Sequence, residues 1–196
     1  MNDLIKNIED GNLVIVPTDT VYGISCDATN KDAINKVFIA KQREQKPLIV
    51  MVSNMDMLNR YIKPLNDLEK QLIDKYWPNT LTILFKKNDN LLDEITCGSE
   101  YVGIRMPNNK LLLDLMNKIN KPIISTSANI SGSSVITNTS LIEPELKEYI
   151  SYVYDDGEKT NIASTLVKVE DGRIKILREG ILSSKIKEDF KDYISE

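Results

Sequence analysis

The sequence contains no histidine, and this absence excludes more chemistry than any other feature of its composition. Without histidine the chain cannot form a Ser-His-Asp or Cys-His catalytic arrangement, a histidine-containing zinc site or a histidine general base. Only two cysteines are present, Cys26 and Cys97, too few for a disulfide framework or a structural zinc site. Any catalysis must therefore depend on positioning and charge stabilisation, or on carboxylates, lysines and hydroxyls.

A basic surplus is also missing, since 25 Lys and Arg face 29 Asp and Glu and the net charge is −4. Proteins that grip a phosphate backbone usually carry a basic surplus, so tight, sequence-independent RNA binding is disfavoured. No apolar run approaches the roughly 20 residues that a membrane helix needs. The first residues, MNDLIKNIEDG, predict a short amphipathic helix rather than a signal peptide. We therefore expect a cytoplasmic protein with no membrane contact.

Strand-like and helix-like segments alternate along the 196 residues, which predicts an α/β fold with a mixed sheet in one domain, residues 1–196. Helical spacing marks residues 4–10, 30–41, 55–61, 64–76, 109–120, 141–150 and 184–194. Strands are expected at 12–16, 24–26, 47–52, 80–85, 101–106, 122–124, 164–169 and 173–177. Asp171-Gly172 between the last two strands is a strong hairpin signal. Residues 86–100 are polar and are expected to form a loop or lid.

Polar side chains gather where several of these strands end. Thr18-Asp19-Thr20 follows the first strand, and Ser125-Thr-Ser-Ala-Asn129 follows a later one. Taken singly, such clusters most often form local turns, and Lys41 and Arg43 at a helix end would simply complement its dipole. Arg105 is harder to explain in this way, because a guanidinium inside an apolar strand needs an anionic partner. Loops meet at strand ends in α/β proteins, so the clusters together suit an anionic, polar ligand.

The ensemble of motifs resembles the YrdC/YciO family, in the family's order and over about residues 12 to 180. The matching pieces are Pro17-Thr-Asp-Thr-Val-Tyr-Gly23, Lys41-Gln-Arg43, Pro47-Leu-Ile-Val50, Gly103-Ile-Arg-Met-Pro107, Ser125-Thr-Ser-Ala-Asn-Ile-Ser-Gly132, Ser164-Thr165 and Leu177-Arg-Glu-Gly180. The resemblance implies a YrdC-like fold, a twisted mixed β-sheet with flanking helices around a large concave cavity. Departures include Met51, where the family often has histidine, and Tyr101, where it often has threonine.

The best-known members of that family are threonylcarbamoyl-AMP synthases, so the resemblance implies a nucleotidyltransferase. Such an enzyme joins L-threonine, bicarbonate or CO2, and ATP, and it releases pyrophosphate. The product serves tRNA threonylcarbamoyladenosine modification, and this short form is expected to hand it to separate transferase proteins, with weak or indirect tRNA binding. ATP is expected as a substrate with Mg²⁺ held by phosphates and water, without a protein metal site or a tightly bound organic cofactor.

The family's signatures assign roles to residues of this chain. The positions implied to be catalytic and to hold the ATP phosphates are Lys41, Arg43, Ser127 and Asn129, and Arg178 matches a further ATP-contacting arginine. The threonine-binding positions match Thr20, Arg105, Ser125 and Ser164, with Tyr22 as a wall of the pocket. Arg105 would pair with the substrate carboxylate. The hydroxyls would select threonine over valine, because valine would leave buried polar groups unpaired.

Two other functions remain open at the level of sequence. One is an RNA-binding or ribosome-maturation module, which the acidic balance and the lack of a basic, aromatic stripe disfavour. The other is carbamoyl-adenylate chemistry with a different acceptor. Pyrophosphate release that requires threonine would distinguish the synthase from both.

Overall fold

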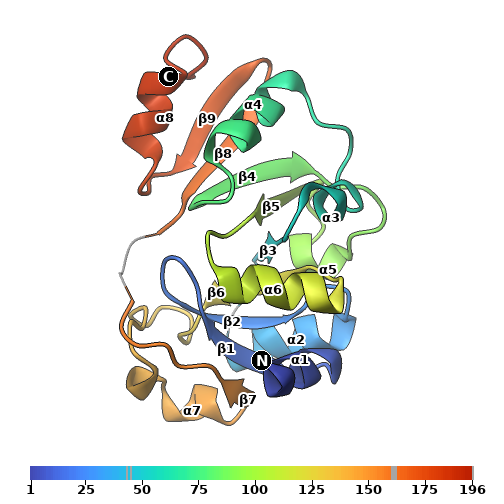
Figure 1. Cartoon of the computed structure of the whole chain (residues 1–196), viewed down its shortest axis with the longest axis vertical. Coiled ribbons are helices and arrows are strands. Elements are labelled where there is room, and N and C mark those ends of the chain that lie inside the picture. The colour runs from blue at the N-terminus through green and yellow to red at the C-terminus, as the bar shows by residue number, and fades with distance from the viewer. Residues whose placement is uncertain (43, 45, 160–162, 196) are drawn as a thin grey trace.

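The computed structural model describes residues 1–42, 44, 46–159 and 163–195, and these form one continuous sheet with helices around it (Figure 1). The strands are β1 Leu13–Pro17, β2 Tyr22–Asp27, β3 Ile49–Met51, β4 Leu81–Lys86, β5 Tyr101–Arg105, β6 Ile123–Ser127, β7 Ile150–Val153, β8 Thr165–Glu170 and β9 Arg173–Arg178. The helices are α1 Asn2–Glu9, α2 Lys31–Ala40, α3 Met55–Asn59, α4 Asp67–Tyr76, α5 Asp93–Thr96, α6 Lys110–Ile119, α7 Pro144–Lys147 and α8 Ser183–Asp189, with a 3-10 turn at Thr139–Leu141.

The sheet is mixed, and its nine strands lie in the order β7-β1-β2-β6-β3-β5-β4-β8-β9. Parallel pairs join β1 to β7, β3 to β5 and β4 to β8, and the other neighbours are antiparallel. The order brings β1, β2, β6, β3, β5, β4 and β8 side by side, although they come from distant parts of the sequence. The predicted α/β class with a mixed sheet is confirmed.

Asparagine begins four of the helices. The side chains of Asn30, Asn54, Asn66 and Asn109 each accept a hydrogen bond from a backbone N–H in the first turn of α2, α3, α4 and α6. Such caps satisfy donors that would otherwise lack partners, which stabilises each helix by about 1 kcal/mol.

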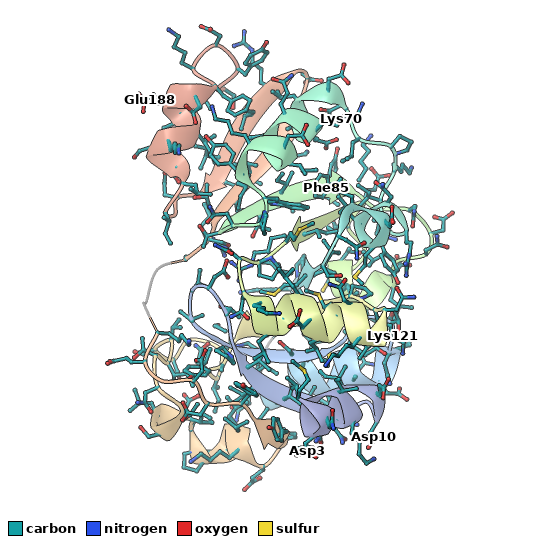
Figure 2. The ribbon with its side chains drawn as sticks, viewed as in Figure 1. Asp3, Asp10, Lys70, Phe85, Lys121 and Glu188 are labelled. Atoms are coloured by element: carbon teal, nitrogen blue, oxygen red, sulfur yellow. The ribbon has the colours of Figure 1, made fainter. Side chains whose placement is uncertain are left out.

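The core lies along both sides of the sheet, and every residue of β1 and β2 is buried. Phe85 is 1% exposed and packs edge-on against Trp77, whereas charged side chains such as Asp3, Asp10, Lys70 and Glu188 lie at the outside (Figure 2). In Figure 1, α1 and α2 lie beside β1 and β2 at one end of the molecule, and α4 and α8 lie at the other. No helix in the described ranges is long and apolar enough to cross a membrane.

Three expectations about local structure need correction. Residues 141–150 do not form one helix, because Pro144 begins the short α7 and β7 follows at the sheet edge. The polar stretch 86–100 contains the short helix α5, with Lys87 paired to Asp93 at 2.7 Å. The strand expected at 122–124 runs on to Ser127, since β6 pairs with β2 along its whole length. The Asp171-Gly172 hairpin is confirmed, and both residues have the positive φ that this turn needs.

Candidate functional site

A cavity of about 410 Å³ opens against the middle of the sheet, and six predicted site residues line it. These are Thr20, Arg105, Ser125, Ser127, Ser164 and Arg178. They come from the β1–β2 loop, the end of β5, the end of β6, the segment before β8 and the end of β9. The arrangement of the strands, rather than closeness in sequence, brings them together. The remaining wall is largely apolar and includes Leu48, Ile49, Met51, Leu84 and Leu166.

The β1–β2 turn is held by the hydroxyl of Thr18, which is buried. Thr18 Oγ1 donates to the carbonyl oxygen of Val21 at 2.7 Å and accepts from the backbone N–H groups of Thr20 and Val21. Thr18 Oγ1 also lies 2.9 Å from Thr20 Oγ1. Either hydroxyl can be the donor in this contact. The contact holds the Thr20 hydroxyl at the cavity, which Thr20 lines.

Gly23 leaves the space that the Ser125 hydroxyl occupies. The two residues lie on neighbouring strands, and both line the cavity. A Cβ atom added at position 23 would lie 2.7 Å from Ser125 Oγ, closer than real Cβ contacts allow. The glycine that follows the turn is therefore needed for close approach of the serine, which keeps a hydroxyl on the cavity wall.

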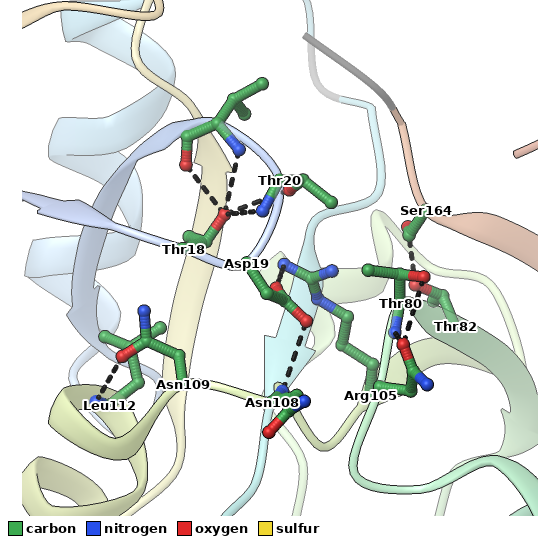
Figure 3. Close-up of polar contacts among 12 residues, drawn as sticks. Thr18, Asp19, Thr20, Thr80, Thr82, Arg105, Asn108, Asn109, Leu112 and Ser164 are labelled. Atoms are coloured by element: carbon green, nitrogen blue, oxygen red, sulfur yellow. Dashed lines mark hydrogen bonds and ion pairs between the residues drawn. The ribbon is translucent and has the colours of Figure 1, made fainter. Parts of the chain in front are cut away.

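Arg105 is paired with Asp19, which supplies the anionic partner that a buried arginine needs. Arg105 Nη2 lies 3.0 Å from Asp19 Oδ1, and the two side chains are only 5% and 9% exposed (Figure 3). Within the described part of the chain, Arg105 Nη1 is buried without a hydrogen-bond partner. Burial lowers the pKa of the Arg105 guanidinium and nearby Arg178 lowers it too, whereas Asp19 raises it. A cationic group with an unused donor is thus held at the cavity, and an anion there would complete its bonding.

Arg178 and Ser164 are joined directly. Arg178 Nε donates to the carbonyl oxygen of Ser164 at 3.0 Å, and Nη2 donates to its hydroxyl at 2.7 Å. The same hydroxyl lies 3.0 Å from Thr82 Oγ1, which is fully buried on β4 (Figure 3). Burial lowers the pKa of the Arg178 guanidinium. Thr82 was not singled out from the sequence, because one threonine inside an apolar strand gives no signal of its own.

Lys41 and Asn129 lie beside the cavity rather than in its lining. Lys41 is 2% exposed, and its ammonium donates to the carbonyl oxygens of Ser127 at 2.5 Å and Asn129 at 2.6 Å. The Asn129 amide in turn donates to the carbonyl oxygens of Ile130 and Ser133. Lys41 therefore fixes Ser127, at the end of β6, and Asn129 in the segment that follows. Arg43, predicted to accompany Lys41, lies outside the described residues.

Tyr22 is not brought into the cavity. It is fully buried, and its hydroxyl donates towards the segment 155–157, with the carbonyl oxygen of Gly157 at 2.7 Å. It also accepts from the backbone N–H of Asp156 at 3.1 Å. Successive side chains of a strand point to opposite faces, and the neighbouring Gly23 lines the cavity. Tyr22 is therefore a core residue that anchors a distant loop, and not a wall of the predicted pocket.

The cysteines contribute no evident chemistry to this site. Cys26 is fully buried, and its burial raises the pKa of the thiol, which disfavours the reactive thiolate. No group of three or more His, Cys, Asp or Glu side chains in the described ranges is arranged to hold a metal ion. The cavity instead offers two guanidinium groups, several hydroxyls and apolar walls. Such a lining suits a small polar ligand with an anionic group.

Comparison with known proteins identifies the family. The model of the Sua5/YciO/YrdC domain, described as "Telomere recombination", matches residues 6–180 of this chain. The chain belongs to the Sua5/YciO/YrdC family. A family member from Methanocaldococcus jannaschii, whose provisional name is threonylcarbamoyl-AMP synthase, is 39% identical over 181 residues, which are 91% of this chain and 84% of that protein.

Two further family members are longer than this chain. The threonylcarbamoyl-AMP synthase of Bacillus subtilis is 34% identical over 88% of this chain and 51% of its own length. The structure of Pyrococcus abyssi Sua5 complexed with L-threonine superimposes with a TM-score of 0.91 at 28% identity, covering 98% of this chain and 57% of that one. The chain thus spans about half the length of these two relatives, and the match to a threonine complex extends over nearly all of its own.

Proposed function

We propose that this protein is a threonylcarbamoyl-AMP synthase, which joins L-threonine, bicarbonate or CO2, and ATP and releases pyrophosphate. The observation that carries the proposal is the buried Arg105 at the cavity, whose Nη1 lacks a partner among the described residues. The carboxylate of an amino acid would supply that partner. Relatives across the family bear the name of this enzyme, and one was solved with L-threonine bound.

The threonine end of the cavity recognises both the carboxylate and the side chain in this proposal. Arg105 pairs with the carboxylate, and Thr20, Ser125 and Ser164 surround the rest of the amino acid with hydroxyls. A hydroxyl in the substrate then replaces water at these groups. Valine would leave them unpaired, and such a site rejects the analogue that lacks the hydroxyl far better than an apolar pocket could.

The nucleotide end has groups from the end of β6 and from β9, to which the family resemblance adds Arg43. We propose that Lys41, Arg43, Ser127, Asn129 and Arg178 hold the ATP phosphates, with Lys41 also fixing the Ser127 segment. Mg²⁺ would be carried by phosphate oxygens and water. No tightly bound organic cofactor is required by this chemistry.

The reaction needs no histidine. The threonine amine combines with bicarbonate to give a carbamate, with loss of water, and a carbamate oxygen is already anionic. That oxygen attacks the α-phosphorus of ATP, the bond to the β-phosphate breaks, and pyrophosphate leaves with the bonding electrons. The residues position the two substrates and stabilise charge on the phosphate oxygens, which is how most phosphoryl-transfer enzymes act.

The fate of the product and contact with tRNA involve surfaces other than this cavity. We propose hand-over of threonylcarbamoyl-AMP to separate tRNA-threonylcarbamoyl transferase proteins in the cytoplasm. Direct contact with tRNA would be weak, in keeping with the net charge of −4.

Pyrophosphate release tests the proposal. The protein is incubated with ATP, Mg²⁺, bicarbonate and threonine, and each component is omitted in turn. Release that requires both threonine and bicarbonate supports the synthase. Release without threonine would indicate a different carbamoyl acceptor, and no release together with salt-sensitive RNA binding would indicate an RNA-binding module.

A further inference from the structure

Asp19 faces two donors at once. Its Oδ1 forms an ion pair with Arg105 Nη2 at 3.0 Å that lacks hydrogen-bond geometry, and its Oδ2 accepts a hydrogen bond of 3.1 Å from the backbone N–H of Asn108. Asp19 is absent from the residues that line the cavity, whereas Arg105 lines it. In Figure 3 the Asp19 carboxylate lies between Asn108 and the guanidinium. The aspartate thus contacts the guanidinium of Arg105 without itself lining the cavity.

Two loops are joined at this point. Asp19 belongs to the β1–β2 loop, and Asn108 belongs to the loop that follows β5. A second bond runs between the same loops, from Asn109 Nδ2 to the carbonyl oxygen of Pro17 at 3.2 Å. Asn109 also caps α6 by accepting from the backbone N–H of Leu112. The position of Asp19 is therefore fixed by the backbone on both sides, and Asp19 can in turn fix a flexible arginine side chain.

We propose that Asp19 is a positioning residue, which holds one edge of the Arg105 guanidinium so that the remaining donor meets the carboxylate of the amino-acid substrate. This inference rests on the proposed function. It goes beyond that function by assigning the orientation of Arg105 to a residue that does not touch the substrate.

A carboxylate is the only side-chain group of this size that fits between the two donors. Asparagine has one acceptor and one amino group, so the amino group would face either Arg105 or the backbone N–H of Asn108. One of the two contacts would then become a contact between donors. The buried guanidinium would lose both its counter-charge and its fixed orientation, and its positive charge would remain in a poorly solvated site.

The Asp19→Asn variant tests whether Asp19 orients the Arg105 guanidinium or only neutralises its charge. If Asp19 positions Arg105, we expect the KM for threonine to rise at least about 30-fold, as is usual when one partner of a buried charge pair is lost. The KM for ATP should change less than about threefold. If Asp19 only neutralised Arg105, its removal would leave a stronger attraction for the carboxylate. The KM for threonine would then fall or stay unchanged, which would overturn the inference.

Asn109→Ala is the matched control. It removes the helix cap and the second bond between the same two loops, but it leaves Asp19 and Arg105 in place. We expect a lower melting temperature and an unchanged KM for threonine. An equal rise of the threonine KM in both variants would show that general loosening of the loops explains the effect, against the inference. Should Asp19→Asn not fold, Asp19→Ser carries the same expectation.

The wild-type protein distinguishes failure of this inference from failure of the proposed function. Wild-type protein without threonine-dependent pyrophosphate release would refute the function itself. Threonine-dependent release by the wild type, with the same threonine KM in Asp19→Asn, would refute only the role of Asp19.

Discussion

Arg178 donates two hydrogen bonds to Ser164, one to the carbonyl oxygen and one to the hydroxyl, at 3.0 and 2.7 Å. The family resemblance implies different substrates for these residues, ATP for Arg178 and threonine for Ser164. In the proposed assignment the two substrate positions share this hydrogen-bonded pair, so a change at one should be measurable at the other.

Ser164→Ala should therefore raise the KM for both substrates. The variant removes the hydroxyl that accepts from Arg178 and contacts Thr82, which leaves buried polar groups unpaired at a cost of about 1–3 kcal/mol. Steady-state kinetics with each substrate varied in turn would measure the effect, with the exposed Ser140→Ala as the control. A change in the threonine KM alone would contradict coupling through Arg178.

Gly23→Ala should weaken threonine binding through Ser125. The new Cβ would lie 2.7 Å from Ser125 Oγ, so the hydroxyl must move at a cost of about 1–3 kcal/mol. Calorimetric titration with threonine would compare Gly23→Ala, Ser125→Ala and the double variant. Because both single changes act on one hydroxyl, the double variant should bind no more weakly than the worse single variant. If the losses of binding free energy instead add in the double variant, Gly23 does not act through the Ser125 hydroxyl.

Lys41→Met should lower both stability and the rate of adenylate formation. The ammonium donates to the carbonyl oxygens of Ser127 and Asn129, and losing such charged hydrogen bonds costs about 1.5–3 kcal/mol each. Lys36→Met, on the helix α2 that precedes Lys41, is the control, since Lys36 is exposed and donates to the carbonyl oxygen of Gly11. Thermal melting and single-turnover rates would be compared. Full activity in Lys41→Met would remove this lysine from the phosphate site.

Tyr22 should make the fold sensitive to high pH. Burial raises the pKa of its phenol from 10.0 to about 12. Between these two values the unfolded chain has lost the proton while the folded chain keeps it, so stability falls as the pH rises through this interval. Denaturant unfolding measured across this pH interval should show the free energy of unfolding falling more steeply for the wild type than for Tyr22→Phe. Equal slopes would show that Tyr22 titrates normally in the fold.

The sequence was sufficient for the class of fold and for most of the cavity. Alternating strands and helices, an Asp-Gly turn and asparagine caps are local signals, and each corresponds to an element of the structure. Motifs at strand ends predicted Thr20, Arg105, Ser125 and Ser164, because such ends meet in a mixed sheet. Helix and strand could not be told apart near residue 150, where β7 depends on pairing with β1.

The sequence did not predict contacts between residues that lie far apart along the chain. Asp19 lies in a cluster that by itself indicates only a local turn, and its pairing with Arg105 depends on the approach of two loops that are distant in sequence. Thr82 lies within a strand and becomes part of the site only because β8 pairs beside β4. Tyr22 belonged to a recognised motif, but strand alternation directs it away from Gly23 and the cavity. A motif shows that residues matter without showing which of them face the ligand.

The most direct test of the central claim is identification of the nucleotide product by mass spectrometry, with isotopically labelled bicarbonate, threonine and Mg-ATP. We predict that threonylcarbamoyl-AMP forms and carries the isotope at its carbamoyl carbon. Product without the isotope, or a labelled adenylate that forms equally well when threonine is withheld, would contradict the assignment of this cavity to threonine.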